Sequence, residues 1–250
     1  MTDAFYKFLA IPNACFLGNR VFKKLFYENA PLAAANKKIF SESISDIRWQ
    51  YSLKPETINI AKYDDDEKEY HEVAVIQVAL KAQNHYMRIA EIIQRAIPYP
   101  LMLVFVHENQ VLINLALKRI NWADSNKITA ESFYFTGWFN PESPDKVSQA
   151  FLESCAINKL PFTDFYKFYS ALVERVVALN CAELSGKFEL DGQKSTEDMR
   201  KVLETIHALE QEQTSFRNEL KNETQFNRKV ELNIKIKQID VQIQGMKDIL

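Results

Sequence analysis

The sequence predicts an α/β body with a mixed sheet and N-terminal helices, followed by helices and a C-terminal antiparallel helical hairpin of coiled-coil type. Residues 47–139 show period-two alternation and short apolar runs, which are typical of strands. Beyond Asp145 only helical patterns occur. The last quarter carries two apolar runs at 3–4 spacing, separated by the polar residues 222–227, and this spacing indicates two helices that face each other.

The amino-acid composition excludes some classes of function. Of the 250 residues, 47% are hydrophobic and 26% are charged, which is ordinary for a globular protein. Only five glycines occur and no Gly-rich phosphate loop is present, so nucleotide-binding motifs of that type are excluded. A net charge of −2 gives no overall attraction for nucleic acid, so any such contact needs a local basic patch.

The cysteine and terminal patterns favour a cytoplasmic protein without a cofactor. Cys15, Cys155 and Cys181 are far apart and odd in number, which fits neither a disulfide framework nor a metal site. The N-terminus shows no signal-peptide pattern, and no apolar run approaches the roughly 20 residues of a membrane span. We expect neither a metal nor a cofactor.

The first 45 residues are expected to be mostly helical. A short helix should end before Pro12. Residues 19–28 carry a helical apolar stripe, and a further helix should run from Pro31, in the first helical position, to about Ser45.

Strand patterns follow. Residues 47–53 alternate apolar and polar side chains, which predicts a half-buried strand, and residues 57–62 are predicted as a second strand. Residues 64–69 are acidic but lack the spacing of a calcium loop, so a solvated hairpin tip is favoured. The apolar run 73–80 predicts a central strand that is covered on both faces.

A helix and three more strands complete the predicted body. Asn84 is the expected cap of a helix that ends before Pro98. The strands are expected at residues 101–106, 111–120 and 131–139.

Residues 140–145 form the clearest linker, and helices are predicted at 146–155 and 163–184. After a break at 186–192, Ser195 or Thr196 should cap the hairpin. The predicted domains are therefore the body 1–139, a linker and helical segment 140–192, and the hairpin 193–250.

The second helix of the hairpin has two apolar faces. Its first face, from Leu232 to Leu250, should pack on the preceding helix. At 100° per residue, Val230, Ile234 and Val241 lie opposite that face. A second apolar face needs a second partner, which could be the body of the same chain, another copy or a different protein.

The predicted order of elements over residues 31–107 is similar to the core of the PD-(D/E)xK nucleases. Those enzymes hold a metal ion with two acids and place a lysine beside the attacking water. Lys81 stands at the expected lysine position, but residue 79 is Ala and residue 59 is Asn. Asp64 and Glu72, at strand ends, are the substitutes that a divergent metal-dependent nuclease would need; a sheet without a metal is the favoured interpretation.

Basic pairs are candidate phosphate contacts, although a solvated helix face explains them equally well. They are Lys23 with Lys24, Lys37 with Lys38, and Lys118 with Arg119, together with Arg228 and Lys229 at the hairpin. If Lys23, Lys24, Lys37 and Lys38 gather on one face, weak and salt-sensitive DNA contact should follow.

Several short blocks, taken in their order and spacing, resemble the bacterial domain-of-unknown-function family 4391 over nearly the whole chain. They are Lys23–Tyr27, Asp46–Trp49 with Leu53–Ile60, Ile97–Pro100, Lys118, and Glu223–Asn233 at the hairpin turn.

The resemblance implies an accessory role and assigns no catalytic residues. Members of the family are commonly encoded beside large helicases and DNA methyltransferases of restriction-like antiphage modules. The leading hypothesis is therefore a non-catalytic adaptor that docks onto a helicase or ATPase, or a methyltransferase, of the same operon. The contact would be made by Phe226, Arg228, Val230, Ile234 and Val241. The alternatives are the divergent nuclease and a structural homodimer joined through the hairpin.

Overall fold

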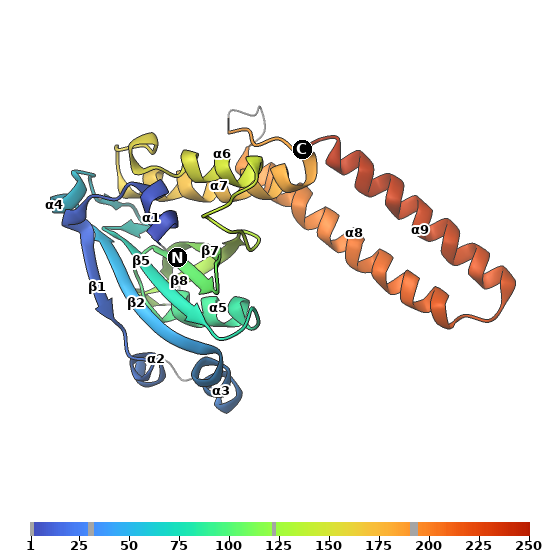
Figure 1. The fold of residues 1–250 in the computed structure, drawn as a ribbon, viewed down its shortest axis with the longest axis horizontal. Coiled ribbons are helices and arrows are strands. Elements are labelled where there is room, and N and C mark those ends of the chain that lie inside the picture. The colour runs from blue at the N-terminus through green and yellow to red at the C-terminus, as the bar shows by residue number, and fades with distance from the viewer. Residues whose placement is uncertain (1–2, 30–32, 122–123, 191–194) are drawn as a thin grey trace. The chain divides into compact units, whose positions relative to one another are not determined.

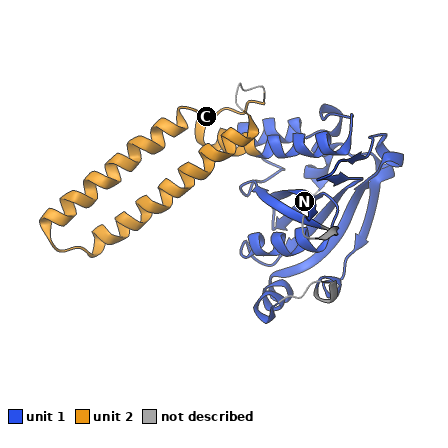
Figure 2. Ribbon diagram, turned by 180° about the vertical axis from the view of Figure 1, so that it is seen from behind, with its two compact units in different colours: residues 1–176 blue, residues 177–250 orange. Residues whose placement is uncertain are grey.

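The computed structural model describes residues 3–29, 33–121, 124–190 and 195–250 (Figure 1). The chain divides into two compact units, residues 1–176 and residues 177–250, which are coloured separately in Figure 2. Residues 140–176 are therefore part of the same compact unit as the sheet. The division into a body, a helical segment and a hairpin, with boundaries after residues 139 and 192, stays a prediction.

A six-stranded mixed sheet forms the centre of the first unit, in the order β1-β2-β5-β6-β7-β8. A two-stranded hairpin, β3-β4, forms a second, small sheet. The strands of the large sheet are β1 (Phe16–Arg20), β2 (Ile44–Leu53), β5 (Val73–Leu80), β6 (Leu101–His107), β7 (Gln110–Asn121) and β8 (Asp124–Phe135). The hairpin strands are β3 (Tyr63–Asp64) and β4 (Glu69–Tyr70).

All neighbouring strands of the large sheet are antiparallel except β5 and β6, which are parallel. Helix α5 (Tyr86–Ala96) makes the crossover that this parallel pair requires. Strand β5 is central, and six of its eight side chains are buried, as its continuous apolar run predicts.

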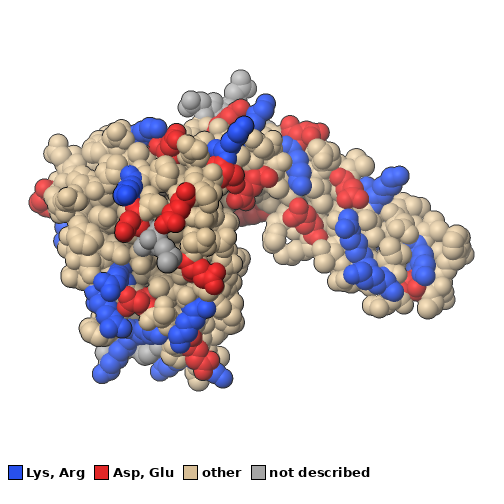
Figure 3. All heavy atoms as spheres, viewed as in Figure 1, with Lys and Arg blue, Asp and Glu red and all other residues tan. Residues whose placement is uncertain are grey.

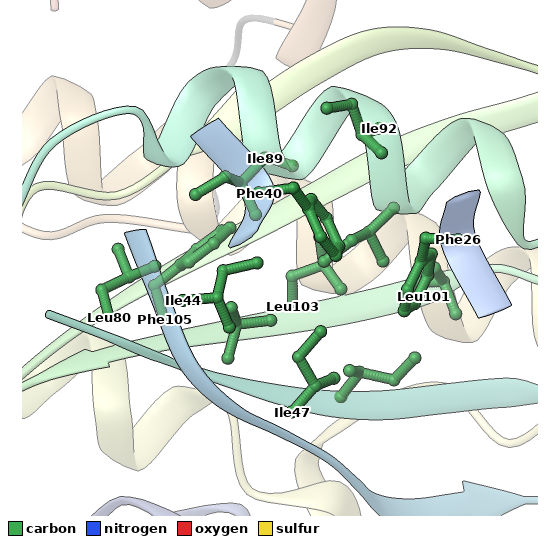
Figure 4. Close-up of a cluster of buried hydrophobic side chains, with 14 of the residues drawn as sticks. Phe26, Phe40, Ile44, Ile47, Leu80, Ile89, Ile92, Leu101, Leu103 and Phe105 are labelled. Atoms are coloured by element: carbon green, nitrogen blue, oxygen red, sulfur yellow. The ribbon is translucent and has the colours of Figure 1, made fainter. Parts of the chain in front are cut away.

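Three helices cover one face of the sheet: α5, α2 (Lys24–Asn29) and α3 (Ala34–Ser43). Figure 4 shows Phe40 and Ile89 from α3 and α5 packed with Ile44, Leu103 and Phe105 from the strands. Phe26, Phe40 and Phe105 are the buried aromatic side chains of this core, where burial of each contributes roughly 1.5–3 kcal/mol.

The opposite face packs against α1 (Asp3–Leu9), α6 (Lys146–Ser154) and α7 (Phe165–Ser185). Short 3₁₀ turns at Asn13–Cys15 and Ile157–Lys159 complete this layer. The N-cap of α6 is Asp145, whose carboxylate accepts a hydrogen bond from the Ser148 amide at 2.8 Å.

The predicted strand at 57–62 is wrong. Pro55 instead begins a one-turn helix, α4 (Pro55–Ile58), because proline suits the first helical position. The Thr57 hydroxyl accepts a hydrogen bond from the Lys54 amide at 2.9 Å, and Asn59 ends the turn in the left-handed region at φ 56°. The acidic segment that follows is a hairpin tip between β3 and β4, as expected.

The predicted helix at 19–28 is half wrong, because its first residues belong to the edge strand β1, which carries Gly18 at φ +63°. Four of the five residues of β1 are exposed, so no alternation marks it in the sequence. The helix predicted from Pro31 is α3, and Pro31 itself lies outside the described residues. Helix α5 begins after His85, so Asn84 is not its cap.

Candidate functional site

The second unit is built around a pair of long helices, α8 (Thr196–Asn222) and α9 (Phe226–Lys247), as the spacing of the apolar residues predicts. Ser195 caps α8, and its hydroxyl accepts a hydrogen bond from the Asp198 amide at 3.1 Å.

The inner faces of α8 and α9 form an apolar seam. Ile206 of α8 packs with Ile239 and Ile243 of α9, and all three are buried. Around them lie partly buried side chains of the same unit: Leu184, Val202, Leu209, Phe216, Met246 and Leu250. The predicted heptad positions therefore face each other.

Polar contacts fix the register of the two helices. The Gln213 amide, which replaces an apolar residue in the seam, donates to the Asp240 carboxylate at 2.5 Å. Arg228 bonds Glu219 of α8 at 3.0 Å and Glu231 of its own helix at 2.9 Å. These two carboxylates raise the pKa of Arg228. Arg228 was predicted to contact a partner protein. In the structure its guanidinium forms ion pairs within the hairpin.

The turn between α8 and α9 is organised by Glu223. Its carboxylate accepts hydrogen bonds from the amides of Thr224 and Gln225, at 2.7 and 2.9 Å. These bonds lower the pKa of Glu223, since they favour its charged form. The carboxylate also lies beside the positive end of α9, which favours a negative charge there.

The outer face of α9 is apolar and exposed. Phe226 is 77% exposed, Val230 42%, Ile234 52% and Val241 69%. A shallow hollow runs between Ile234 and Val241, with Lys237 and two glutamines on its walls. We call Phe226, Val230, Ile234 and Val241 the outer face of α9.

The nuclease candidates are not brought together. Glu72 precedes β5 and Lys81 follows it, so nine residue steps of extended chain, about 30 Å, separate them. Glu72 contacts Ser52 and Lys54, and Asp64 contacts His71 in the small hairpin.

Asp46 is an acidic residue near Lys81 that the sequence analysis did not predict. Asp46 of β2 is paired with Ala79 of β5, two residues before Lys81. Its carboxylate forms ion pairs with Arg20 at 3.1 Å and with Arg48 at 2.8 Å. In the part of the chain that the structure describes, no group of three or more His, Cys, Asp or Glu side chains could hold a metal ion. Only the pairing of β2 with β5 reveals this position, because Asp46 is 35 residues from Lys81 in the sequence.

The candidate phosphate contacts divide into exposed and occupied groups. Lys24, Lys37 and Lys38 are exposed on α2 and α3. The Lys23 ammonium donates to the carbonyl oxygen of Ser41 at 3.0 Å and to that of Ile44. Arg119 pairs with Glu131 across β7 and β8.

Lys118 is not a surface contact, because it is only 2% exposed. Its ammonium donates to the carbonyl oxygen of Gln94 at 2.7 Å and to that of Ile97, at the C-terminal end of α5. These carbonyls satisfy the ammonium where no water reaches it. The predicted phosphate contact at Lys118 is therefore wrong.

Burial lowers the pKa of Lys118 well below its ordinary value, because the charged ammonium is desolvated. Between this lowered pKa and about 10.4, the unfolded chain binds one proton more than the folded chain. The contribution of Lys118 to the unfolding free energy therefore increases with pH in that window. Urea unfolding at a series of pH values rising toward about 10 should show a gap between wild type and Lys118→Met that grows in favour of wild type once the pH exceeds the lowered pKa of Lys118. Parallel pH profiles of the two proteins would contradict a lowered pKa.

One comparison with known proteins places this chain in a family. No helix among the described residues is long and apolar enough to cross a membrane. Searches of curated proteins and of solved structures find no match. A family model described as "Domain of unknown function (DUF4391)" matches residues 9–243, which include both units. The chain therefore belongs to the DUF4391 family.

Proposed function

We propose that this chain is a non-catalytic adaptor that binds another protein through the outer face of α9. The observation that carries the proposal is the exposure of Phe226, Val230, Ile234 and Val241 on the side of α9 opposite its packed seam. An exposed apolar face on an ordered helix is typical of an interaction surface.

The spacing of these side chains suits a groove on a partner. Phe226, Val230 and Ile234 are four residues apart and Val241 follows seven residues later, so all four lie along one side of the helix. A helix of this kind binds by laying its apolar face into a groove. Burial of an Ile or Val side chain contributes roughly 1.5–3 kcal/mol, so two such anchors carry a large share of a micromolar affinity.

Charge favours a different protein over a second copy. Between Phe226 and Lys247, α9 has five basic residues against two acidic ones, a net charge of +3. The basic residue beside the hollow of the outer face is Lys237, so two copies of α9 packed face to face would bring these like charges together, which opposes association. An acidic groove would complement this helix. In line with the family resemblance, we propose that the partner is a helicase or ATPase, or a methyltransferase, encoded beside this gene.

The divergent nuclease is not proposed, because Asp64 and Glu72 do not meet Lys81. The position opposite Ala79 holds a single carboxylate, Asp46, which two arginines already bind. A metal-dependent cleavage site needs more carboxylate ligands than that.

The test is co-purification of the tagged chain with the neighbouring gene products expressed together. We expect Ile234→Asp/Val241→Asp to abolish capture, since each carboxylate would have to be buried in the groove. The matched control is Ser215→Asp/Asn218→Asp, which adds the same two carboxylates at exposed positions of α8 and should keep full capture.

Unchanged melting temperatures must accompany the result, so that lost capture reports binding and not unfolding. Equal capture by both variants would overturn the proposal. Sedimentation of the purified chain as a dimer that the α9 variant converts to monomer would establish the homodimer instead.

A further inference from the structure

Four basic residues meet at one end of the large sheet, where strands β1, β2 and β5 lie side by side. Arg20 of β1 is paired with Arg48 of β2, and both bind the Asp46 carboxylate. The backbone amide of Lys81 bonds the Ser43 carbonyl oxygen at 2.9 Å, next to the start of β2. We call Arg20, Lys23, Arg48 and Lys81 the basic cluster.

The charges of this cluster act on one another. The pKa of Lys23 is lowered, first by burial and then by the positive charges of Lys81 and Arg20. Asp46 is the one carboxylate that acts against this effect. Figure 3 shows Lys and Arg side chains gathered over the end of the first unit that carries β1, α2 and α3. The four positive charges of the cluster outnumber Asp46 and the exposed Glu42 of α3, on a chain whose net charge is −2.

An exposed aromatic ring lies within this positive region. Phe22 is 64% exposed, and the Arg20 guanidinium stands over its ring at 5.8 Å from the centroid. A folded protein gains nothing by presenting a phenyl ring to water, whereas a ring beside cations suits the stacking of an unpaired base.

We propose that the basic cluster and Phe22 form a binding site for single-stranded nucleic acid. Arg20 and Arg48 keep 63% and 48% of their side chains exposed, so their guanidinium groups can bind phosphate while they hold Asp46. Lys81 is exposed and adds a third phosphate contact. The Lys23 ammonium donates to two backbone carbonyl oxygens, so it adds positive potential to the site without contacting a phosphate directly.

The Phe22 ring distinguishes a single strand from a duplex. A duplex keeps its bases stacked inside and offers Phe22 only sugar and phosphate, so the ring would contribute little. An acidic protein surface would also satisfy the arginines, so the response of binding to strand type and to Phe22→Ala is what separates the two kinds of partner. Unpaired bases use both features, since phosphates meet the cations and a base covers the ring.

The test is fluorescence anisotropy of the full chain with three labelled probes: a 20-nucleotide DNA strand of mixed sequence, the same sequence as RNA, and the blunt DNA duplex. Three phosphate contacts predict a slope of about −2 for log affinity against log salt with single strands. Arg20→Gln/Lys81→Gln should reduce that slope by about 1.4. Phe22→Ala should weaken single-strand binding by roughly 5- to 150-fold and leave duplex binding unchanged.

The matched control is Lys62→Gln/Lys159→Gln, which removes two exposed charges of the same unit beyond the opposite end of β2. It should bind as wild type does. Binding of either single-stranded probe with these dependences supports the proposal. No binding at 50 mM salt, an equal loss in the control, or tighter binding of the duplex would overturn it. Because the site lies in the first unit, its failure leaves the proposal for α9 untouched.

Discussion

Ile239→Asp should detach α9 from α8, whereas Ile234→Asp, five residues earlier on the same helix, should leave the hairpin folded. Ile239 is buried against Ile206 and Ile243, so the substitution removes a packed side chain and places a carboxylate in an apolar seam. Together these effects cost about 3 kcal/mol or more. Ile234 is 52% exposed, and its replacement costs only the small difference in helix propensity.

Hydrogen exchange resolves the two cases residue by residue. In Ile239→Asp, the amides of α9 should exchange on the order of a hundredfold faster than in wild type, while those of β5 and β6 keep their protection. In Ile234→Asp, α9 should exchange at nearly the wild-type rate. Equal loss of protection in both variants would mean that the outer face belongs to the folded core of the hairpin and is not free to bind.

Tyr70→Phe and Tyr169→Phe should each destabilise the first unit by about 1–3 kcal/mol, although neither leaves a cavity. The Tyr169 hydroxyl accepts from the Ala116 amide at 3.0 Å and donates to the Leu101 carbonyl oxygen at 2.6 Å. The Tyr70 hydroxyl accepts from the Lys118 amide at 2.9 Å and lies 3.2 Å from its carbonyl oxygen.

These hydroxyls act where β7 extends beyond its neighbour β6 and where its pairing with β8 shifts register between Ala116 and Lys118. Without them, buried backbone groups lose their partners, which costs more than an ordinary hydrogen bond contributes. Because the two rings lie 5.9 Å apart, the two effects should not simply add.

Chemical unfolding monitored by tryptophan fluorescence measures these losses. Tyr99→Phe is the matched control, since it deletes a hydroxyl from a ring that is 40% exposed and should change stability by less than about 0.5 kcal/mol. Equal effects of the buried and the exposed substitutions would mean that the Tyr70 and Tyr169 hydroxyls do not stabilise the buried backbone groups of β7.

Apolar patterns predicted the segments whose buried faces pack against neighbouring layers. The run at Val73–Leu80 became the central strand, and the 3–4 spacing from Met199 to Leu250 became the α8–α9 pair. The pattern failed at β1, where both sides of the strand are exposed and no alternation exists. It also failed at residues 57–62, where Pro55 and Thr57 favour a helical turn.

The two candidate sites were predictable to different degrees. The outer face of α9 follows from the geometry of one helix, so Val230, Ile234 and Val241 could be placed opposite the seam from the sequence. The basic cluster joins Arg20 and Arg48 of two paired strands with Lys23 and Lys81, which follow β1 and β5. Basic pairs in the sequence made Lys118 as good a candidate phosphate contact as Lys23. Burial removed Lys118 from the set, and strand pairing added Arg20 and Arg48.

The sequence by itself determined which segments are helix or strand wherever one face is buried, because side-chain periodicity records that contact directly. It also determined that α9 has more apolar surface than α8 can cover. Only the tertiary structure decided which residues distant in the sequence share an environment: Asp46 opposite Ala79, the Lys118 ammonium at the end of α5, and Arg20 beside Arg48. Such neighbours depend on strand order and register, which are set by the packing of the whole sheet and leave no local mark in the sequence.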